Sequence, residues 1–166
     1  REHVRATLGD RDPSAEDISK LTYTAQVVQE SMRLYPPAWV MEREAIGDDT
    51  LAGYGIPGRS TVAVCPYVLH RRPDLWPDPE RFDPERFTPE RVKDRPKHAY
   101  LPFGHGPRQC IGHAFAMMET VIIVSMFARE LALDLAAGGT VEPEPLTTLR
   151  PKGLRMIPRI VAEETR

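Results

Sequence analysis

The sequence predicts an α+β fold that is mainly helical, and three observations lead to this class. Two stretches, residues 21–35 and 111–131, have the apolar spacing or the apolar content of helices. Short β-like runs lie between them, within residues 40–64. A proline-rich stretch, residues 73–87, fits neither a helix nor a central strand, so we expect it to wrap the surface as a meander.

The composition is that of about one globular domain. The chain has 166 residues, and 41% of them are hydrophobic, which is enough to form a core. Its 22 basic and 24 acidic side chains give a net charge of −2, and there is no lysine-rich block, so a nucleic-acid partner is not expected. The 17 prolines, roughly twice the usual share, indicate long turn-rich connections.

The cysteines and the apolar runs bear on where the protein works. Cys65 and Cys110 form neither a C-x-x-C pair nor a repeated spacing, which argues against a disulfide framework and against a zinc site. We therefore expect a reduced, cytoplasmic setting. No apolar run has the length of a membrane span, and no signal peptide is visible. The chain opens at Arg1 within a charged phrase, so we expect it to be part of a longer protein, which leaves open an upstream membrane anchor.

The helix predicted at residues 21–35 carries two opposite charges close to an apolar edge. Glu30 lies beside that edge, and because a lone buried carboxylate is costly, it needs a partner. Arg33, three residues on, can reach it on the helix surface. Taken alone, the two could equally form a solvated helix pair, worth roughly a few tenths of a kcal/mol. Pro36 and Pro37 end the helix.

The middle of the chain reads as short strands followed by the meander. Runs at residues 40–46, 50–56 and 60–64 predict a small, mostly antiparallel sheet, with a type II turn at Pro57-Gly58. Arg43 lies on the first run. One interpretation is that it is an arginine at the edge of a strand, with its side chain in water. In the meander, the phrase PERF occurs twice, at residues 79–82 and 84–87.

The end of the chain is expected to be β. A strand follows the second long helix at residues 130–136, and residues 146–149 and 154–160 are expected to form a terminal hairpin around Pro151-Lys152-Gly153. Because the second long helix is apolar nearly all round, we expect it to be buried.

The most informative stretch is residues 103–112, FGHGPRQCIG, which places a cysteine among glycines just before the second long helix. The free amides and the positive dipole end of a helix favour a thiolate over a thiol. Glycines let the backbone turn tightly and approach a flat ligand without a side-chain clash. A soft thiolate beside an open cationic surface is what a haem iron and its propionates require.

A lone cysteine at a helix start is more often a buried structural residue. Here, however, five positions fit the pattern F-x-x-G-x-R-x-C-x-G, and chance is a poor explanation for the match. These positions are Phe103, Gly106, Arg108, Cys110 and Gly112. His105 lies five positions before the cysteine, and we expect it to pack or to bond backbone rather than to bind a metal.

With this pattern, the loop resembles the haem-binding loop of the cytochrome P450 haem-thiolate monooxygenases. The resemblance implies that the Cys110 thiolate is the fifth ligand of the haem iron, and so the metal ligand of this chain. The other residues that it assigns to cofactor binding are Arg108, Arg43, Phe103, Gly106 and Gly112. Arg43 would face a haem propionate.

The resemblance also implies a structural network. The phrase QESMRLYPP is similar to the family's E-x-x-R helix, so Glu30 and Arg33 would be its paired residues. The meander arginine that completes the network would be Arg86, from the second PERF phrase, with Arg81 as the second choice.

The resemblance runs in order over nearly all of the chain, from the E-x-x-R helix through the small β-sheet, meander, cysteine loop and buried apolar helix to the terminal β-hairpin. It implies that residues 1–166 are a partial domain, the C-terminal third or so of such an enzyme. Residues 1–20 do not match the family's oxygen-activating helix. We therefore expect no catalytic residue in this segment, and no activity from the segment alone.

The function implied by the resemblance is a monooxygenase that inserts one atom of O2 into a small hydrophobic organic substrate. Haem would be the cofactor, and a ferredoxin or a flavoprotein reductase would be the electron donor. Three alternatives stay open: a haem-thiolate peroxygenase that uses hydrogen peroxide, a haem-binding protein without turnover, and a zinc or redox-thiol protein, which would show metal without a haem absorption band.

Overall fold

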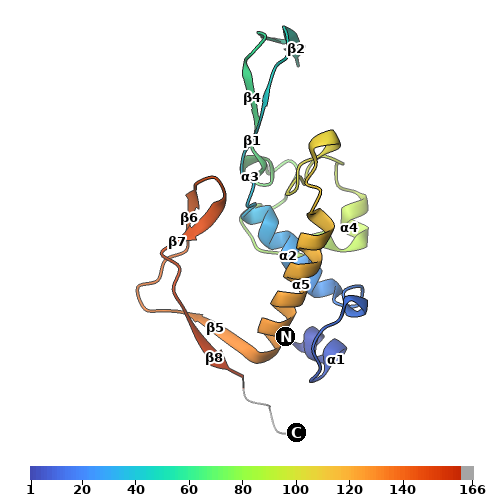
Figure 1. Cartoon of the computed structure of the whole chain (residues 1–166), viewed down its shortest axis with the longest axis vertical. Coiled ribbons are helices and arrows are strands. Elements are labelled where there is room, and N and C mark those ends of the chain that lie inside the picture. Colours follow the sequence, from blue (N-terminus) through green and yellow to red (C-terminus); the bar gives the residue numbers. More distant parts are fainter. Residues whose placement is uncertain (162–166) are drawn as a thin grey trace.

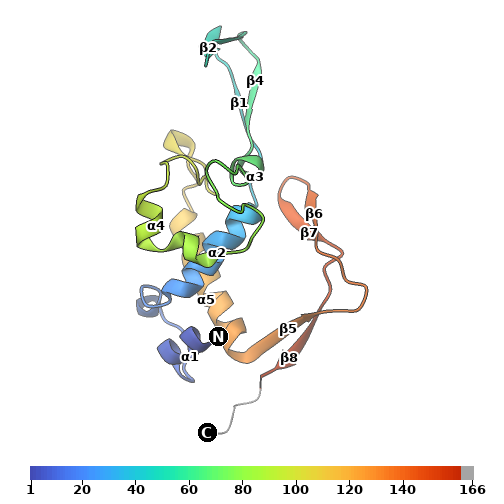
Figure 2. The same cartoon turned by 180° about the vertical axis from the view of Figure 1, so that it is seen from behind.

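The computed structural model describes residues 1–161 and is arranged around two helices, α2 (Thr22–Leu34) and α5 (His113–Glu130), which lie side by side (Figure 1). α1 (Glu2–Leu8) packs against α5 near the end of that helix. The strands form separate two-stranded ladders that extend away from the helices, as the view from behind also shows (Figure 2). The predicted mixture of helices and small antiparallel ladders is confirmed.

The remaining helical elements are short. They are η1 (Ala15–Asp17), α3 (Pro66–Leu69), η2 (Pro84–Phe87), α4 (Pro89–Lys93) and η3 (Gly106–Arg108). The strand pairs of residues 1–161 are all antiparallel. They are β1 (Met41–Glu44) with β4 (Thr61–Val64), β2 (Asp49–Leu51) with β3 (Tyr54–Ile56), β5 (Leu131–Leu135) with β8 (Met156–Ile160), and β6 (Glu142–Pro145) with β7 (Leu149–Lys152).

α2 forms where the apolar spacing predicts it. At its end, the N–H of Tyr35 donates to the carbonyl of Ser31 at 2.8 Å. Pro36 and Pro37 follow directly, and proline cannot continue a helix because it lacks the N–H and clashes with the preceding turn. The helix therefore stops at the predicted position.

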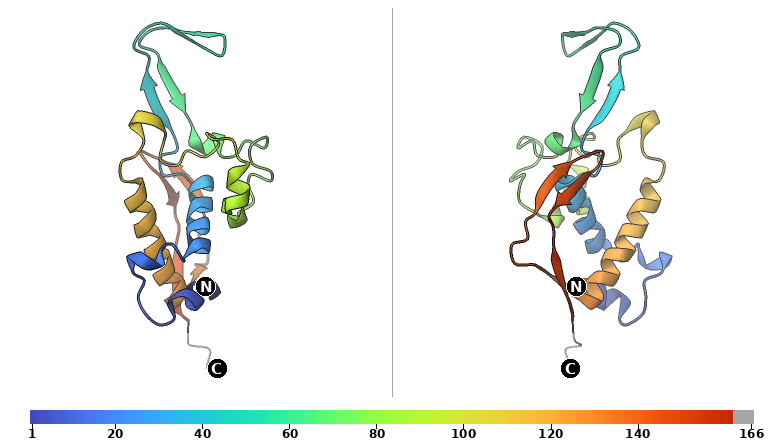
Figure 3. Two further views of the ribbon diagram at one scale, coloured as in Figure 1. Left: turned by 90° about the vertical axis from the view of Figure 1, so that its right-hand side faces the viewer. Right: turned by 60° about the vertical axis from the view of Figure 1, so that its left-hand side comes forward.

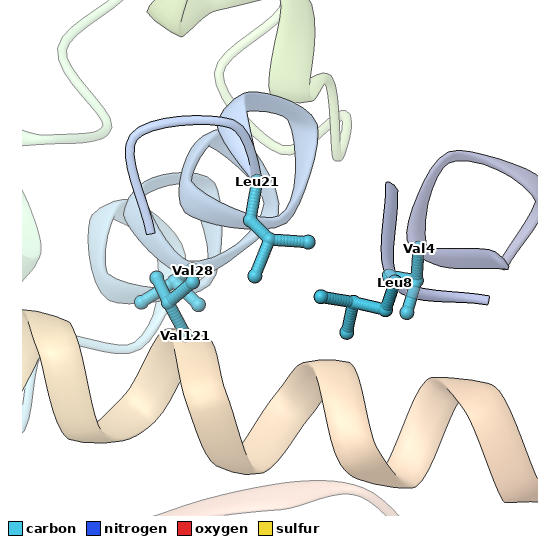
Figure 4. Close-up of a cluster of buried hydrophobic side chains, with 5 residues drawn as sticks. All are labelled: Val4, Leu8, Leu21, Val28 and Val121. Atoms are coloured by element: carbon cyan, nitrogen blue, oxygen red, sulfur yellow. The ribbon is translucent and has the colours of Figure 1, made fainter. Parts of the chain in front are cut away.

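The main hydrophobic core lies between α1, α2 and α5. Its buried side chains are Val4, Leu8, Leu21, Val28 and Val121. Figure 4 shows Val28 and Val121 meeting between the two long helices. Full burial of such a side chain stabilises a fold by roughly 1.5–3 kcal/mol relative to exposure, so this cluster fixes how α2 and α5 pack.

α5 is buried on one side only, whereas its composition predicts burial nearly all round. Val121 and Ser125 are buried on the side that α1 and α2 cover. Phe115 and Phe127, on the other side, are 62% and 50% exposed. Residues 1–161 supply cover for one face, and the second apolar face stays open.

A second, aromatic cluster is formed by side chains of the meander and by the segment that follows it. Trp76 and Phe87 are buried there, and Tyr100 packs against them, with the rings of Phe87 and Tyr100 centred 4.9 Å apart. The second PERF phrase forms η2, whose first free amide, on Glu85, donates to the Asp83 side chain at 3.1 Å. Within residues 73–83 there is neither helix nor strand, as the prolines predict.

The strands β1 and β4 form an arm that carries β2 and β3 at its tip (Figure 3). The turn before β4 differs from the predicted type II turn at Pro57-Gly58. The residue with positive φ is Arg59 (φ 67), and the N–H of Ser60 donates to the Pro57 carbonyl at 3.1 Å. Gly58 is favoured for another reason: a Cβ there would lie 3.2 Å from the backbone of Gly47, which is a tight contact.

The C-terminal strands also pair differently from the predicted hairpin of residues 146–149 with 154–160. β7 pairs with β6, while β8 returns to β5, directly after α5. The predicted strand at 130–136 is confirmed as β5. The pairing of β5 with β8 joins segments far apart in the sequence, and alternating side chains alone do not specify such a partner.

Within the described part of the chain, none of the helices combines the length and the apolar character needed to cross a membrane.

The core assignment can be tested with a matched pair of valines. Val121→Ala is expected to lower the free energy of unfolding of the full-length protein by roughly 2–3 kcal/mol, because two buried methyl groups are lost and a cavity is left. Val92→Ala on α4 removes the same atoms from a side chain that is 44% exposed. This change should lower the free energy of unfolding by less than about 0.5 kcal/mol. Urea unfolding measures both, and equal losses would contradict the assignment.

Candidate functional site

The structure joins Glu30 and Arg33 of α2 in a fully buried ion pair. Both side chains are 0% exposed. The Arg33 Nε donates to Glu30 Oε2 at 2.7 Å, and Nη2 donates to Oε1 at 2.8 Å. This bidentate geometry is the strongest that a guanidinium and a carboxylate can form. The alternative reading of a solvated surface pair is therefore wrong.

Backbone carbonyls take up the other donors of Arg33. Nη1 donates to the carbonyls of His70 and Pro79, at 2.8 and 2.7 Å, and Nη2 donates to the carbonyl of Arg81 at 3.2 Å. All five N–H groups of the guanidinium are thus used. One side chain of α2 therefore holds the chain just before the meander, at His70, and within it, at Pro79 and Arg81.

Arg86 joins this pair from η2. Its Nε lies 3.5 Å from Glu30 Oε1, which makes an ion pair without a hydrogen bond, and its Nη2 donates to the Asp78 carbonyl at 2.9 Å. Glu30 Oε1 also accepts the backbone N–H of Asp83 at 2.8 Å. The Arg81 side chain is exposed, and only its carbonyl enters the network.

His70 connects the network to the segment that leads into the cysteine loop. The imidazole is 0% exposed, with Nδ1 3.2 Å from the Arg33 carbonyl and Nε2 accepting the Leu101 N–H at 2.8 Å. Burial lowers the pKa of His70 to about 4, and the nearby positive charges of Arg33, Arg71 and Arg95 act in the same direction. The side chain is therefore neutral near pH 7.

The cysteine loop owes its shape to two of its glycines. Gly104 and Gly106 have φ values of 73 and 72, which L side chains rarely adopt. The Cys110 N–H donates to the Phe103 carbonyl at 2.9 Å and closes the loop. Gly112 has an ordinary φ, and a Cβ there would lie 4.0 Å from the Cys110 sulfur, in ordinary van der Waals contact with it. Glycine at this position places no side chain beside the thiol.

Cys110 lies just before α5 with its side chain exposed. Its carbonyl accepts the backbone N–H of His113 at 3.4 Å, and the Nδ1 of the same histidine lies 3.2 Å from that carbonyl oxygen. The backbone of Cys110 is thus fixed on both sides, while its sulfur faces outward. This arrangement suits a thiol that binds a ligand, and it does not suit a core cysteine.

The other residues assigned to the cofactor lie in different settings. Arg108, in η3, is exposed on the same loop as Cys110. Phe103 is half-buried and lines an apolar groove of about 360 Å³ between α2 and α5. Arg43 is exposed on β1, and its Nη1 donates to the carbonyl of neighbouring Glu42 at 2.7 Å.

His105 packs against another histidine, as its position off the ligand pattern suggests. The rings of His98 and His105 are centred 4.7 Å apart, and both residues are exposed. Over residues 1–161, the histidine, cysteine and acidic side chains form no group of three or more that could hold a metal ion.

Sequence reasoning missed three residues that support the site: His70, Arg95 and Tyr100. Arg95 lies over Trp76, 4.3 Å from the ring centre, and donates to the Arg86 carbonyl. The Tyr100 hydroxyl donates to the Gln29 carbonyl at 2.9 Å, and burial raises the pKa of this tyrosine well above its usual value. A single polar residue in an irregular segment has no periodic pattern, so the sequence carries no signal for its burial.

Comparisons with known proteins agree with this geometry. Residues 1–159 match the family model of cytochrome P450. Cyclooctatin synthase of Streptomyces melanosporofaciens is 41% identical over 155 residues, which cover 93% of this chain and 34% of that protein. Cyclooctat-9-en-7-ol 5-monooxygenase of the same organism is 42% identical over 134 residues, which cover 81% of this chain and 29% of that protein.

The solved structure of retinoic acid-bound cyanobacterial CYP120A1 has a TM-score of 0.89 to this chain, with 35% identity over 97% of this chain and 38% of that one. The chain spans about a third of the length of the curated relatives it matches. The family match runs through the buried Glu30–Arg33 pair, the meander and the cysteine loop in one continuous stretch. On these grounds, the chain belongs to the cytochrome P450 family.

Proposed function

We propose that this chain is the haem-binding part of a monooxygenase, in which Cys110 ligates the haem iron and one atom of O2 is inserted into a small hydrophobic organic substrate. The observation that carries the proposal is the exposed Cys110 thiol, held by the backbone of a glycine loop in a cytochrome P450 chain. The name of the relative cyclooctat-9-en-7-ol 5-monooxygenase supports the reaction class.

The residues present fit a haem group. The Cys110 sulfur is exposed, and Gly112 leaves the adjacent space free of a side chain. Gly106, with a φ of 72, lets the loop turn tightly and itself presents no side chain to a flat ligand. Arg108 and Arg43 are exposed cations that would pair with the haem propionates. When bound, a haem with a thiolate ligand provides the chemistry that cleaves the O–O bond of O2.

In this proposal, the residues of this chain bind the haem, orient it and support the loop that holds it. Phe103 lies at the wall of the groove between α2 and α5, next to the loop, and would pack against the face of the bound group. Glu30, Arg33 and Arg86 form the structural network that holds the meander on α2, and they are not placed to touch a substrate. We assign no catalytic residue to this chain.

The partners in this proposal are a small hydrophobic substrate and an electron donor, a ferredoxin or a flavoprotein reductase. A peroxygenase would act with hydrogen peroxide alone, and a haem-binding protein without turnover would show the haem spectrum but no product with either oxidant. Comparing product formation by the full-length protein with a reductase system and with hydrogen peroxide separates the three. The cytoplasmic setting and the lack of a nucleic-acid partner stay predictions.

The ligand assignment predicts the effect of removing one thiol. In the full-length protein, Cys110→Ala should abolish the strongly red-shifted Soret band of the reduced, carbon monoxide-treated haem, because that band requires a thiolate ligand. The matched control is Cys65→Ala. Cys65 is half-buried, and its Sγ donates to the Trp39 carbonyl at 3.2 Å, so its removal should keep the band. A band that persists in Cys110→Ala would overturn the assignment.

The structural network predicts a large difference between two bidentate ion pairs. Glu30→Ala leaves Arg33 buried without its counter-ion and should cost on the order of 3–5 kcal/mol of folding free energy, with poor haem incorporation. Asp74→Ala breaks the Arg72–Asp74 pair, whose side chains are more than half exposed, and should cost less than about 1 kcal/mol.

Yield of soluble, haem-loaded full-length protein and its urea unfolding curve measure both changes. A soluble and fully haem-loaded Glu30→Ala protein with only an altered substrate affinity would show that the network is part of the substrate site instead.

A further inference from the structure

We propose that His70 is a positioning residue for the cysteine ligand, and that only its neutral imidazole, with the proton on Nδ1, holds the cysteine loop in its ligating conformation. This inference rests on the proposed role of Cys110. It adds a side chain that lies outside the F-x-x-G-x-R-x-C-x-G loop and outside the Glu30–Arg33–Arg86 network.

The first step is a reciprocal contact between His70 and Arg33. The Arg33 Nη1 donates to the His70 carbonyl at 2.8 Å, while the Arg33 carbonyl lies 3.2 Å from the His70 Nδ1. Two carbonyls and two side chains thus fix α2 to the segment that follows α3. A carbonyl oxygen can only accept, so Nδ1 must carry a proton to complete this contact.

The second step leads from the other ring nitrogen to the loop. Nε2 lies 2.8 Å from the backbone nitrogen of Leu101, which can only donate, so Nε2 must be unprotonated. The Leu101 carbonyl accepts the Gly104 N–H at 3.2 Å, and the Phe103 carbonyl accepts the Cys110 N–H at 2.9 Å. A short series of backbone contacts therefore runs from the imidazole to the cysteine.

The surroundings of His70 keep it neutral. The charged groups that face it are Arg33 from α2, Arg71 from its own segment and Arg95 from beyond the meander, and all are cations. The aromatic rings of Trp76 and Tyr100 pack against the imidazole, with centres 6.2 and 5.2 Å away, and the carboxylate of Glu30 is already bound to Arg33. A second proton on the ring would enter a dry site that is already positive.

The sign of the pH effect follows from this. The pKa of His70 in the folded protein is about 4, below the ordinary value of about 6.5. Its contribution is therefore complete above about pH 6.5 and is lost as the pH falls through about 4. Once protonated, Nε2 becomes a donor that faces the Leu101 N–H, and the start of the loop is released.

Two substitutions separate the two ring nitrogens. The amide of glutamine reaches about as far as Nε2, so His70→Gln can accept the Leu101 N–H and does not titrate. The amide of asparagine reaches only about as far as Nδ1, so His70→Asn can serve the Arg33 carbonyl but leaves the Leu101 N–H without an acceptor. A histidine that merely fills the core would be replaced equally well or equally badly by both.

The test uses the full-length protein. The first measurement is hydrogen exchange at pH 7 of the peptide that contains residues 101–110, in haem-free protein. Relative to wild type, we expect exchange about tenfold faster in His70→Asn, which corresponds to the loss of one hydrogen bond, and little change in His70→Gln. The second measurement is the fraction of thiolate-ligated haem, from the carbon monoxide-treated Soret band, between pH 7 and pH 4.

In the second measurement, wild type should lose thiolate ligation as the pH approaches 4, His70→Gln should lose less, and the exposed-histidine control His98→Gln should follow wild type. Equal exchange in the Gln and Asn variants, or an acid transition in His70→Gln identical to that of wild type, would overturn the proposal. If His70→Asn does not fold, the acid transition of His70→Gln decides alone. If wild type shows no thiolate band at any pH, the proposed function fails, and the exchange measurement still decides the role of His70.

Discussion

The buried pair of Glu30 and Arg33 is the constraint on which the rest of this structure depends. An ion pair without water is stable only if each remaining donor and acceptor is satisfied, because an unpaired buried charge costs several kcal/mol. The guanidinium meets this requirement with three backbone carbonyls, and the carboxylate meets it with the N–H of Asp83 and the charge of Arg86. The meander has no regular secondary structure of its own over residues 73–83, so these contacts specify its path.

The same pair explains how the cysteine loop can be open and still be well positioned. A ligating thiol has to be exposed, so few side chains can pack around it. Here the support comes from buried contacts of the segment that leads into the loop. Arg33 binds the His70 carbonyl, and His70 in turn accepts the N–H of Leu101. The Tyr100 hydroxyl of the same segment donates to the Gln29 carbonyl. The loop then closes on itself through the Cys110 N–H, and the sulfur needs no packing of its own.

How much of this the sequence predicts depends on whether a feature is local. The helix at 21–35 and the glycine loop were predictable, because periodicity and glycine content act over a few residues. The choice of Arg86 over Arg81 came from a family resemblance, and no local rule distinguishes the two PERF phrases. The partner of β8 and the role of Gly58 were wrongly predicted, since both depend on which distant backbone lies nearby. A lone buried histidine such as His70 carries no pattern at all.

The chemistry of arginine explains why this support is ionic and not apolar. A pair of apolar side chains at positions 30 and 33 could fill the same volume, and replacing both partners of a buried ion pair in this way is often neutral for stability. It could not, however, fix the direction of three separate carbonyls. Lysine offers three donors on a flexible stem, whereas the planar guanidinium presents five N–H groups at set angles, and all five are used here. What the pair contributes is the orientation of a segment that lacks secondary structure, and through His70 that orientation reaches the cysteine.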